Sequence, residues 1–152
     1  MKAQDTIGYQ VKSSWQAIVR MYNRLTIEHD FSQAEGYVLI SIKKEGIPVT
    51  KIAPLMGIEP TSLSRLLKTM EEKGLVYRKK DQKDRRVVRL YLTEKGLELK
   101  KVSRHMVLNY NRIVYDQIGQ DEMENFLKTM TKIRNITCNL TLQAEEQDSK
   151  NC

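Results

Sequence analysis

Hydroxyl and basic side chains share one face of a predicted helix over residues 60–73. Apolar residues recur there at three- and four-residue steps, which predicts one buried stripe and one polar face. The polar face carries Thr61, Ser62, Ser64, Arg65 and Lys68. Small hydroxyls permit close approach to a DNA backbone, and an arginine can pair bidentately with guanine. The pattern indicates a DNA-reading helix, and an ordinary polar surface helix is the alternative for this segment alone.

A charged hairpin follows that helix. Residues 75–79 and 87–92 are rich in β-branched and aromatic residues, and the intervening segment is polar, which predicts two strands with a projecting tip. The candidate contacts on this ribbon are Arg78, Lys80, Lys83, Asp84, Arg85 and Arg86. A cationic ribbon can enter the minor groove, where the potential is most negative. The carboxylate of Asp84 is expected to orient the guanidinium of Arg86 two residues later.

A solvated charged turn would explain the hairpin by itself. The combination with a preceding pair of short helices is more specific, because a tight turn at residues 57–59 joins those helices. Two helices joined in this way form a helix-turn-helix, whose second helix enters the major groove. The two features together predict a winged helix-turn-helix.

Capping residues and glycines delimit the elements that position these side chains. Ser32 and Glu35 form a capping box for a helix that is expected to end at residues 43–46. Thr50 is expected to cap a short third helix closed by Gly57, and Pro54 within it predicts a shortened or tightened helix. The fourth helix is predicted to begin at Pro60 and to stop at Gly74.

Long amphipathic helices are predicted on both sides of this region. The first spans residues 7–25, with apolar positions at helical spacing. Thr93 is expected to cap a helix that runs to Ile118, and Gly119 marks a break before the last helix. The chain from residue 144 is expected to form a polar tail that frays.

Positive charge is concentrated in the centre of the chain. The 152 residues contain 26 Lys and Arg against 19 Asp and Glu, a net charge of +7. Residues 65–104 hold 14 basic and 6 acidic residues, hence +8, and the remainder holds 12 and 13, hence −1. This distribution favours a localised surface for a polyanion over general solubility.

Composition argues against several other classes of protein. No apolar run approaches the ~18 residues of a transmembrane helix, and the N-terminus lacks the apolar region of a secretory signal. The lack of such a run predicts no membrane partner. Two late cysteines do not make a disulfide framework, so we expect a reducing cytoplasm. With no phosphate-cradling glycine loop and no Ser-His-Asp candidate, we expect neither catalytic residues nor a cofactor, and hence no enzyme.

The sequence resembles the multiple antibiotic resistance regulator (MarR) family. The resemblance is carried by residues 60–67 and 71–76, by the Asp84-Arg85-Arg86 wing pattern, and by Leu92-Thr93-Glu94-Lys95-Gly96. It implies a mainly α fold with a minor α+β part: a winged helix-turn-helix with N- and C-terminal dimerisation helices. It also implies a homodimer that binds double-stranded DNA, usually as a repressor released by a small ligand, with Arg86 as the minor-groove finger.

The resemblance divides the chain into functional regions. A single MarR-like domain is expected over residues 1–143, with dimerisation helices at 1–31 and 93–143, a DNA-binding lobe at 32–92 and a polar tail at 144–152. A non-regulatory architectural or RNA-binding winged helix is the alternative function. It predicts no preference for a palindromic site and no response to a ligand.

The sequence indicates much less about a signal. Four aromatic residues are candidates to line a pocket for a small aromatic or phenolic effector: Trp15, Tyr22, Tyr37 and Tyr110. Aromatic residues at helical spacing also form ordinary cores. His29 and His105 lack metal-ligand spacing, so no metal site is predicted. Cys138 is expected to be a small buried core residue rather than a redox sensor, and Cys152 is expected to have no role.

Overall fold

The computed structural model describes residues 2–150 of the chain, and side chains from residue 2 to residue 145. Met1 and Cys152 lie outside the described residues. The chain forms two compact units, residues 1–107 and residues 108–152, which are described separately. Among the described residues, none of the helices combines the length and apolar character needed to cross a bilayer.

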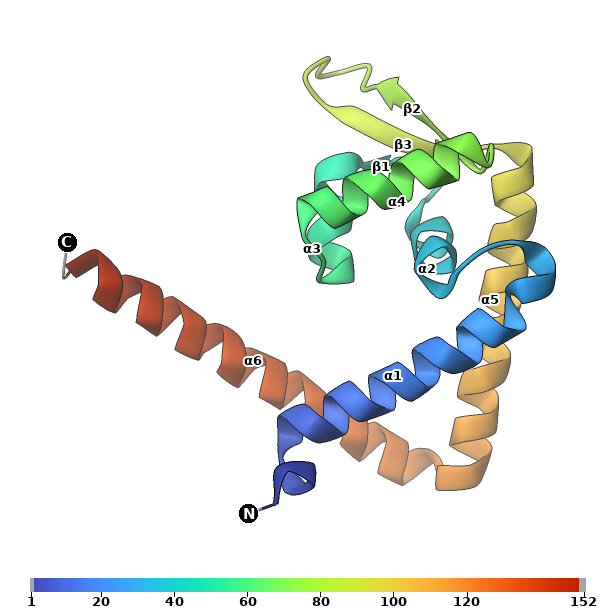
Figure 1. The fold of residues 1–152 in the computed structure, drawn as a ribbon. Coiled ribbons are helices and arrows are strands. Elements are labelled where there is room, and N and C mark those ends of the chain that lie inside the picture. The colour runs from blue at the N-terminus through green and yellow to red at the C-terminus, as the bar shows by residue number, and fades with distance from the viewer. Residues whose placement is uncertain (1, 151–152) are drawn as a thin grey trace. The chain divides into compact units, whose positions relative to one another are not determined.

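Unit 1 is a small helical bundle with a three-stranded sheet (Figure 1). Its α-helices are α1 (Ile7–Leu25), α2 (Gln33–Ser41), α3 (Ile52–Met56) and α4 (Pro60–Glu72), followed by the first part of α5 (Glu94–Ile118). The strands are β1 (Ile47–Pro48), β2 (Val76–Lys80) and β3 (Val88–Leu92). Short 3-10 turns occupy Ala3–Asp5, Ile27–His29 and Val49–Lys51. This element order is the expected helix-turn-helix followed by a β-hairpin.

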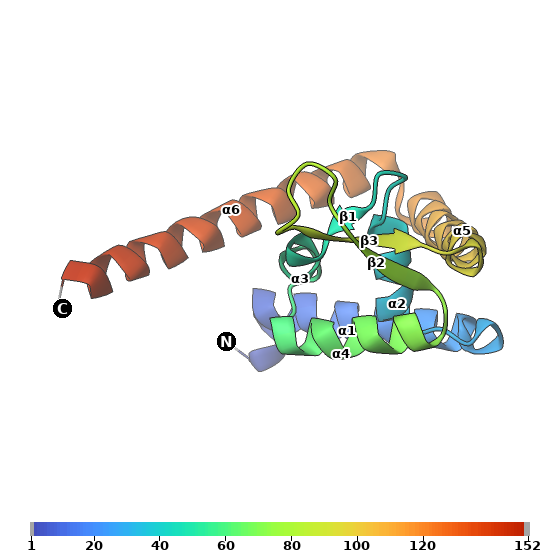
Figure 2. The same ribbon diagram turned by 90° about the horizontal axis from the view of Figure 1, so that it is seen from above.

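The sheet has the order β1-β3-β2, with both pairs antiparallel. Tyr77 of β2 stands opposite Tyr91 of β3, and Ile47 of β1 opposite Leu90. Figure 2 shows the sheet beside α4, in agreement with Figure 1. Among the described residues, β1 is the one strand that the sequence analysis did not anticipate, because two residues carry no periodic signal.

The core of unit 1 lies between α2, α3, α4 and the sheet. Its fully enclosed side chains include Leu39 and Ile42 of α2, Leu67 and Met70 of α4, and Leu90 of β3. The apolar stripe of α4 therefore faces inward, as its spacing predicted. Burial of this stripe orients the opposite face of the same helix toward solvent.

Several predicted boundaries are confirmed by hydrogen bonds. The Ser32 hydroxyl accepts from the Glu35 amide at 3.2 Å, and the Glu35 carboxylate accepts from the Ser32 amide at 2.6 Å, so the capping box is present. Pro60 is the first residue of α4, and Gly74 follows its end with a φ of +68°. Gly119, with a φ of +94°, separates α5 from the next helix.

Two predicted boundaries are wrong. Thr50 does not cap the third helix: it lies inside the Val49–Lys51 3-10 turn, which leads directly into α3 without a side-chain cap. Pro54 is the third residue of the five-residue α3, a position whose amide would have no partner within the helix, so the proline is accommodated there; a 3-10 turn precedes α3. The second helix ends at Ser41 rather than at residues 43–46.

Thr93 and Gly96 join the sheet to α5. The Thr93 hydroxyl accepts from the Gly96 amide at 3.0 Å, which is the predicted N-terminal cap, and it donates to the Gly74 carbonyl oxygen at 2.7 Å. A Cβ atom placed on Gly96 would lie 2.0 Å from the Leu75 carbonyl oxygen. The start of α5 therefore packs against the chain leaving α4 at a distance that only glycine permits.

Unit 2 contains the end of α5 and the helix α6 (Gln120–Lys150). Most of its apolar side chains are exposed, among them Ile113, Phe126, Leu127 and Leu140. The backbone remains helical as far as Lys150, so the helix continues into the segment predicted to be a fraying polar tail. The exposed apolar residues indicate that unit 2 has no core of its own sufficient to bury them.

We expect Gly96→Ala to destabilise unit 1 by about 3 kcal/mol, because the added methyl group meets backbone atoms that cannot rotate away. The measurement is thermal unfolding by circular dichroism, with an expected fall in Tm of about 10 °C. Gly8→Ala in α1 is the matched control, since nothing lies within 4 Å of a Cβ there. A Gly96→Ala variant as stable as the control would contradict the packing of Gly96 against Leu75.

Candidate nucleic-acid interface

The predicted reading face of α4 is exposed. Leu63, Leu67 and Met70 of this helix are buried. The five candidate side chains are all exposed to solvent: Thr61, Ser62, Ser64, Arg65 and Lys68. The Ser64 hydroxyl donates to the Pro60 carbonyl oxygen at 2.9 Å, so its oxygen can still accept a hydrogen bond from a ligand. The helix therefore presents hydroxyl acceptors and two cations on one accessible face.

Asp84 holds Arg86 at the tip of the hairpin. The Arg86 Nε donates to one carboxylate oxygen of Asp84 at 3.0 Å, and Nη2 donates to the other at 3.1 Å. This bidentate pair is the orientation that the sequence predicted. The hydrogen bond from the Arg86 side chain lowers the pKa of Asp84, and the same bond raises the pKa of Arg86. Arg86 is 91% exposed, so its free edge is available to a ligand.

A second carboxylate holds the base of the hairpin loop. Asp81 accepts from the Lys83 amide at 2.7 Å and from the Asp84 amide at 3.1 Å. It also forms an ion pair with Arg89 of β3. The Arg89 guanidinium donates in addition to the carbonyl oxygens of Glu45 and Gly46, both at 3.3 Å. The loop is thereby connected to the segment before β1.

Sequence analysis missed the role of Asp81. An aspartate at the start of a polar turn is a local signal, because its side chain commonly accepts from amides two and three residues later. The link to Arg89 and onward to Gly46 had no such signal, since residues 46 and 89 are far apart in sequence. The pairing of β1 with β3 brings the Gly46 carbonyl oxygen to Arg89 and so connects Asp81 to this distant segment.

Arg78 does not lie at the tip of the wing. It occupies the middle of β2 and its Nε lies 3.0 Å from a carboxylate oxygen of Glu71 in α4. Arg78 stays a predicted wing contact, with its charge partly neutralised by Glu71 where the hairpin meets α4. Lys80, Lys83 and Arg85 are exposed at or beyond the end of β2.

The predicted sensor residues fall in different parts of the chain. Trp15, Tyr22 and Tyr37 lie in unit 1, and Tyr110 lies in unit 2. Two cavities in the described part of unit 1 are lined by other residues. The aromatic effector pocket therefore stays a prediction.

Cys138 is exposed in the described structure, so its assignment as a buried core residue is wrong. The apolar positions around it on α6, including Ile136 and Leu140, are exposed as well, because α6 has no core against which to pack within unit 2. His29 and His105 are both exposed. The described residues contain no group of three or more potential metal ligands close enough to share an ion.

The sequence profile of the MarR family matches residues 31–88, which contain α2, α3, α4, β1, β2 and the loop of the hairpin and end at the first residue of β3. The chain carries a MarR family domain. The MarR domain includes every side chain described above as a candidate DNA contact. It begins at the residue before the Ser32 capping box and ends in β3.

Individual relatives agree with this assignment. The HTH-type transcriptional repressor MdtR of Bacillus subtilis is 33% identical over 101 residues, which is 63% of this chain and 65% of MdtR. The chain spans slightly less than two thirds of the length of the first curated relatives that it matches.

Solved structures share the fold. The S. aureus MepR–DNA complex superposes with a TM-score of 0.77 at 21% identity, covering 86% of this chain and 97% of MepR. CouR from Rhodococcus jostii, bound to p-coumaroyl-CoA, gives 0.77 at 23% identity, covering 88% of this chain and 94% of CouR. At these identities the likeness shows the winged helix-turn-helix fold around the MarR domain.

We expect the Asp81 carboxyl group to titrate with a pKa of about 2, below its ordinary value of 3.8. The largest cause is the hydrogen bond from Arg89, followed by the amides of Lys83 and Asp84. A depressed pKa means that the carboxylate stabilises the folded loop above pH ~4, and that this contribution is lost as the pH falls through about 2.

Carbon-detected NMR of the Asp81 carboxyl resonance measures this pKa directly. In Arg89→Gln the pKa is expected to rise toward 3.8, because the principal hydrogen bond is lost. Lys95→Gln on α5 is a control that removes a cation elsewhere and leaves the resonance unchanged. An ordinary pKa for Asp81 in the unaltered chain would contradict the ion pair with Arg89.

Proposed function

We propose that this chain is a DNA-binding transcriptional regulator of the MarR type. The observation that carries the proposal is the exposed polar face of α4 together with the adjoining hairpin, at whose tip Asp84 orients an exposed Arg86. A helix of this kind enters the major groove, and a cationic hairpin tip reaches the neighbouring minor groove. The likeness in fold to MepR, which was solved with DNA, supports this mode of docking.

The individual contacts follow from the chemistry of each side chain. On α4, Arg65 is assigned to a base edge, while Thr61, Ser62, Ser64 and Lys68 are assigned to backbone and base contacts at close range. On the hairpin, Arg86 is assigned to the minor groove, and Lys80, Lys83 and Arg85 to phosphates. Asp84 positions Arg86 and does not itself touch DNA.

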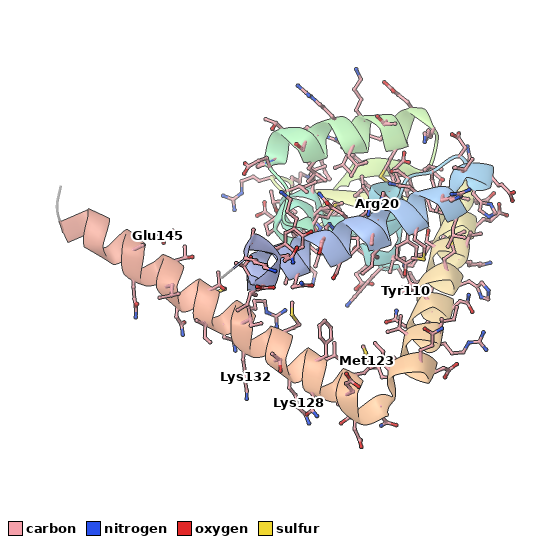
Figure 3. The ribbon with its side chains drawn as sticks, turned by 60° about the horizontal axis from the view of Figure 1, so that its bottom comes forward. Arg20, Tyr110, Met123, Lys128, Lys132 and Glu145 are labelled. Atoms are coloured by element: carbon pink, nitrogen blue, oxygen red, sulfur yellow. The ribbon has the colours of Figure 1, made fainter. Side chains whose placement is uncertain are left out.

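The active species in this proposal is a homodimer that acts in the cytoplasm on double-stranded DNA. Exposed apolar residues on α1 and α6 support self-association, among them Val11, Trp15, Phe126 and Leu140. The opposite side of α6 is polar: Figure 3 shows Lys128 and Lys132 projecting together from it. A two-fold dimer predicts a roughly palindromic site with half-sites about one helical turn of DNA (~34 Å) apart.

The finer role proposed is that of a repressor released by a small-molecule effector. The name of MdtR as a repressor supports the repressor role, and the p-coumaroyl-CoA bound to CouR supports a small-molecule effector. Such an effector would release DNA only by binding more tightly to a form of the dimer that no longer matches the operator.

We expect Arg86→Ala to weaken operator binding about tenfold at ~150 mM salt and to reduce the salt slope by about one counterion. The measurement is fluorescence anisotropy with the operator selected from the source genome. Lys132→Ala on the polar side of α6 removes an exposed cation and is expected to bind as the unaltered chain does (Figure 3). Affinity within twofold of the unaltered chain would overturn the assignment of the wing.

Arg65→Ala is expected to act differently, because a base contact specifies the DNA sequence, whereas a phosphate contact only positions the protein on the duplex. The variant should lose preference at one base pair in each half-site while it retains affinity for random duplex DNA. Competition with random duplex DNA also separates the regulator from an architectural or RNA-binding module. Equal affinity of the unaltered chain for operator and random DNA would favour that module.

Dimerisation through the apolar side of α6 can be tested separately. Phe126→Asp combined with Leu140→Asp places two charges among exposed apolar residues, and we expect the dimer to dissociate in sedimentation velocity. Asn135→Asp combined with Asn139→Asp adds the same charge at exposed positions on the polar side of α6 and should leave the dimer intact. A monomeric unaltered chain would contradict the proposal.

A further inference from the structure

Unit 1 contains a cavity of about 560 Å³ that the proposed DNA contacts do not use. It is bounded by the chain after α2, the base of the β2–β3 hairpin and the first turns of α5. Its polar lining is cationic: Lys43, Lys44, Lys100, Lys101 and Arg104. A cavity of this size matches the pockets that bind small molecules.

Two tyrosines form one wall of this cationic cavity. Tyr77 and Tyr91 stand opposite each other across β2 and β3, and their ring centroids lie 5.6 Å apart with an interplanar angle of 19°. Leu92 and Leu97 add apolar surface beside them. Tyr77 is 46% exposed, so part of the stacked pair remains accessible to a ligand.

The cavity opens on the side of the hairpin away from α4. Side chains alternate between the two faces of a strand, and Arg78 points toward α4, where it pairs with Glu71. Its neighbour Tyr77 must therefore point to the opposite face, as does Tyr91 across the ladder. The reading face of α4 and the cationic cavity thus lie on different sides of the same hairpin.

The charged side chains around the cavity favour an anionic ligand. None of the described residues that line it is acidic. Lys100 donates from Nζ to the Ile42 carbonyl oxygen, which fixes one ammonium group at the wall. Lys101 and Arg104 are exposed on neighbouring turns of α5, and Lys43 and Lys44 are exposed after α2. Like charges gathered at one cavity repel one another, and a bound polyanion relieves that repulsion.

We propose that this cavity binds a nucleotide, with the base stacked on the tyrosine pair and the phosphates held by the cations. Lysine ammonium groups and the arginine fork are the side chains that bind phosphate oxygens most strongly. A stacked aromatic wall adds nothing for a bare phosphate but contributes to binding of a planar base. The site therefore takes a ligand that joins an aromatic ring to two or more negative charges.

The shape of the cavity distinguishes this occupant from a flanking stretch of DNA backbone. A duplex keeps its bases stacked inside the helix, so its backbone phosphates could reach the cations while no base reaches the tyrosine pair. Tyr77 and Tyr91 both line the cavity, where a free base can reach them. The test includes a DNA arm, because five cations would also attract a duplex.

The experiment is isothermal titration of the full chain, without DNA, with ADP, adenosine and inorganic pyrophosphate. ADP is expected to bind at least about tenfold more tightly than either fragment, because it alone engages both the aromatic wall and the cations. Because no DNA is present, the outcome is independent of the proposed regulatory function.

Two variants dissect the site. Lys101→Gln combined with Arg104→Gln is expected to weaken ADP binding at least about tenfold. Tyr77→Leu is expected to remove the advantage of ADP over pyrophosphate, because the stacking surface is lost. The matched control is Lys12→Gln combined with Arg20→Gln on α1, which removes the same charges from exposed positions outside the cavity (Figure 3). Circular dichroism checks that each variant is folded.

Several results would overturn the proposal. One is the absence of a binding heat with ADP, GDP or UDP up to about 1 mM. Others are that pyrophosphate binds as tightly as ADP, or that the Lys101 and Arg104 variant binds ADP as the unaltered chain does. The DNA arm gives another: a tenfold loss of operator affinity in that variant with ADP binding unchanged would assign the cavity to DNA. Operator affinity equal to that of the unaltered chain, together with weakened ADP binding, supports the nucleotide site.

Discussion

Burial of the apolar stripe of α4 is the constraint on which the rest of the MarR domain depends. Leu67 and Met70 have no exposure to solvent and pack with α2 and β3 in a single core. A helix has only one orientation that buries a stripe at this spacing, so the rotation of α4 about its axis is set by the core. Thr61, Ser62 and Arg65 are presented outward as a consequence.

Carboxylates organise the cations of the hairpin. Asp84 directs Arg86 outward, Asp81 ties Arg89 to the segment before β1, and Glu71 draws Arg78 back toward α4. A cluster of like charges would otherwise leave these long side chains dispersed in solvent. The three acidic residues therefore do more than reduce the net charge of the hairpin, because each one fixes the direction of one arginine side chain.

The hairpin has chemically different surfaces on its two sides. One side faces α4 through Arg78, and the other bears Tyr77 and Tyr91 above the cationic cavity. Arg89 and the Gly46 carbonyl oxygen connect the loop to the chain that leads from Lys43 and Lys44. A ligand at the cavity and a DNA contact at the tip would thus act on the same pair of strands.

Local chemistry allowed the sequence by itself to determine most of the secondary structure and the reading face. The capping box at Ser32, the start of α4 at Pro60 and the cap at Thr93 are interactions within four residues, so the order of residues specifies them. Helical spacing likewise specifies which face of α4 is polar.

Tertiary structure decided what depends on residues that are distant in the chain. Features of this kind are the pairing of β1 and the cavity bounded by the chain after α2, the hairpin and α5. Others are the links from Arg89 to Gly46 and from Arg78 to Glu71, and the contact of Gly96 with Leu75. Periodicity reports only which face a residue occupies. The partner that meets that face is chosen by the packing of the whole core, and no local pattern encodes it.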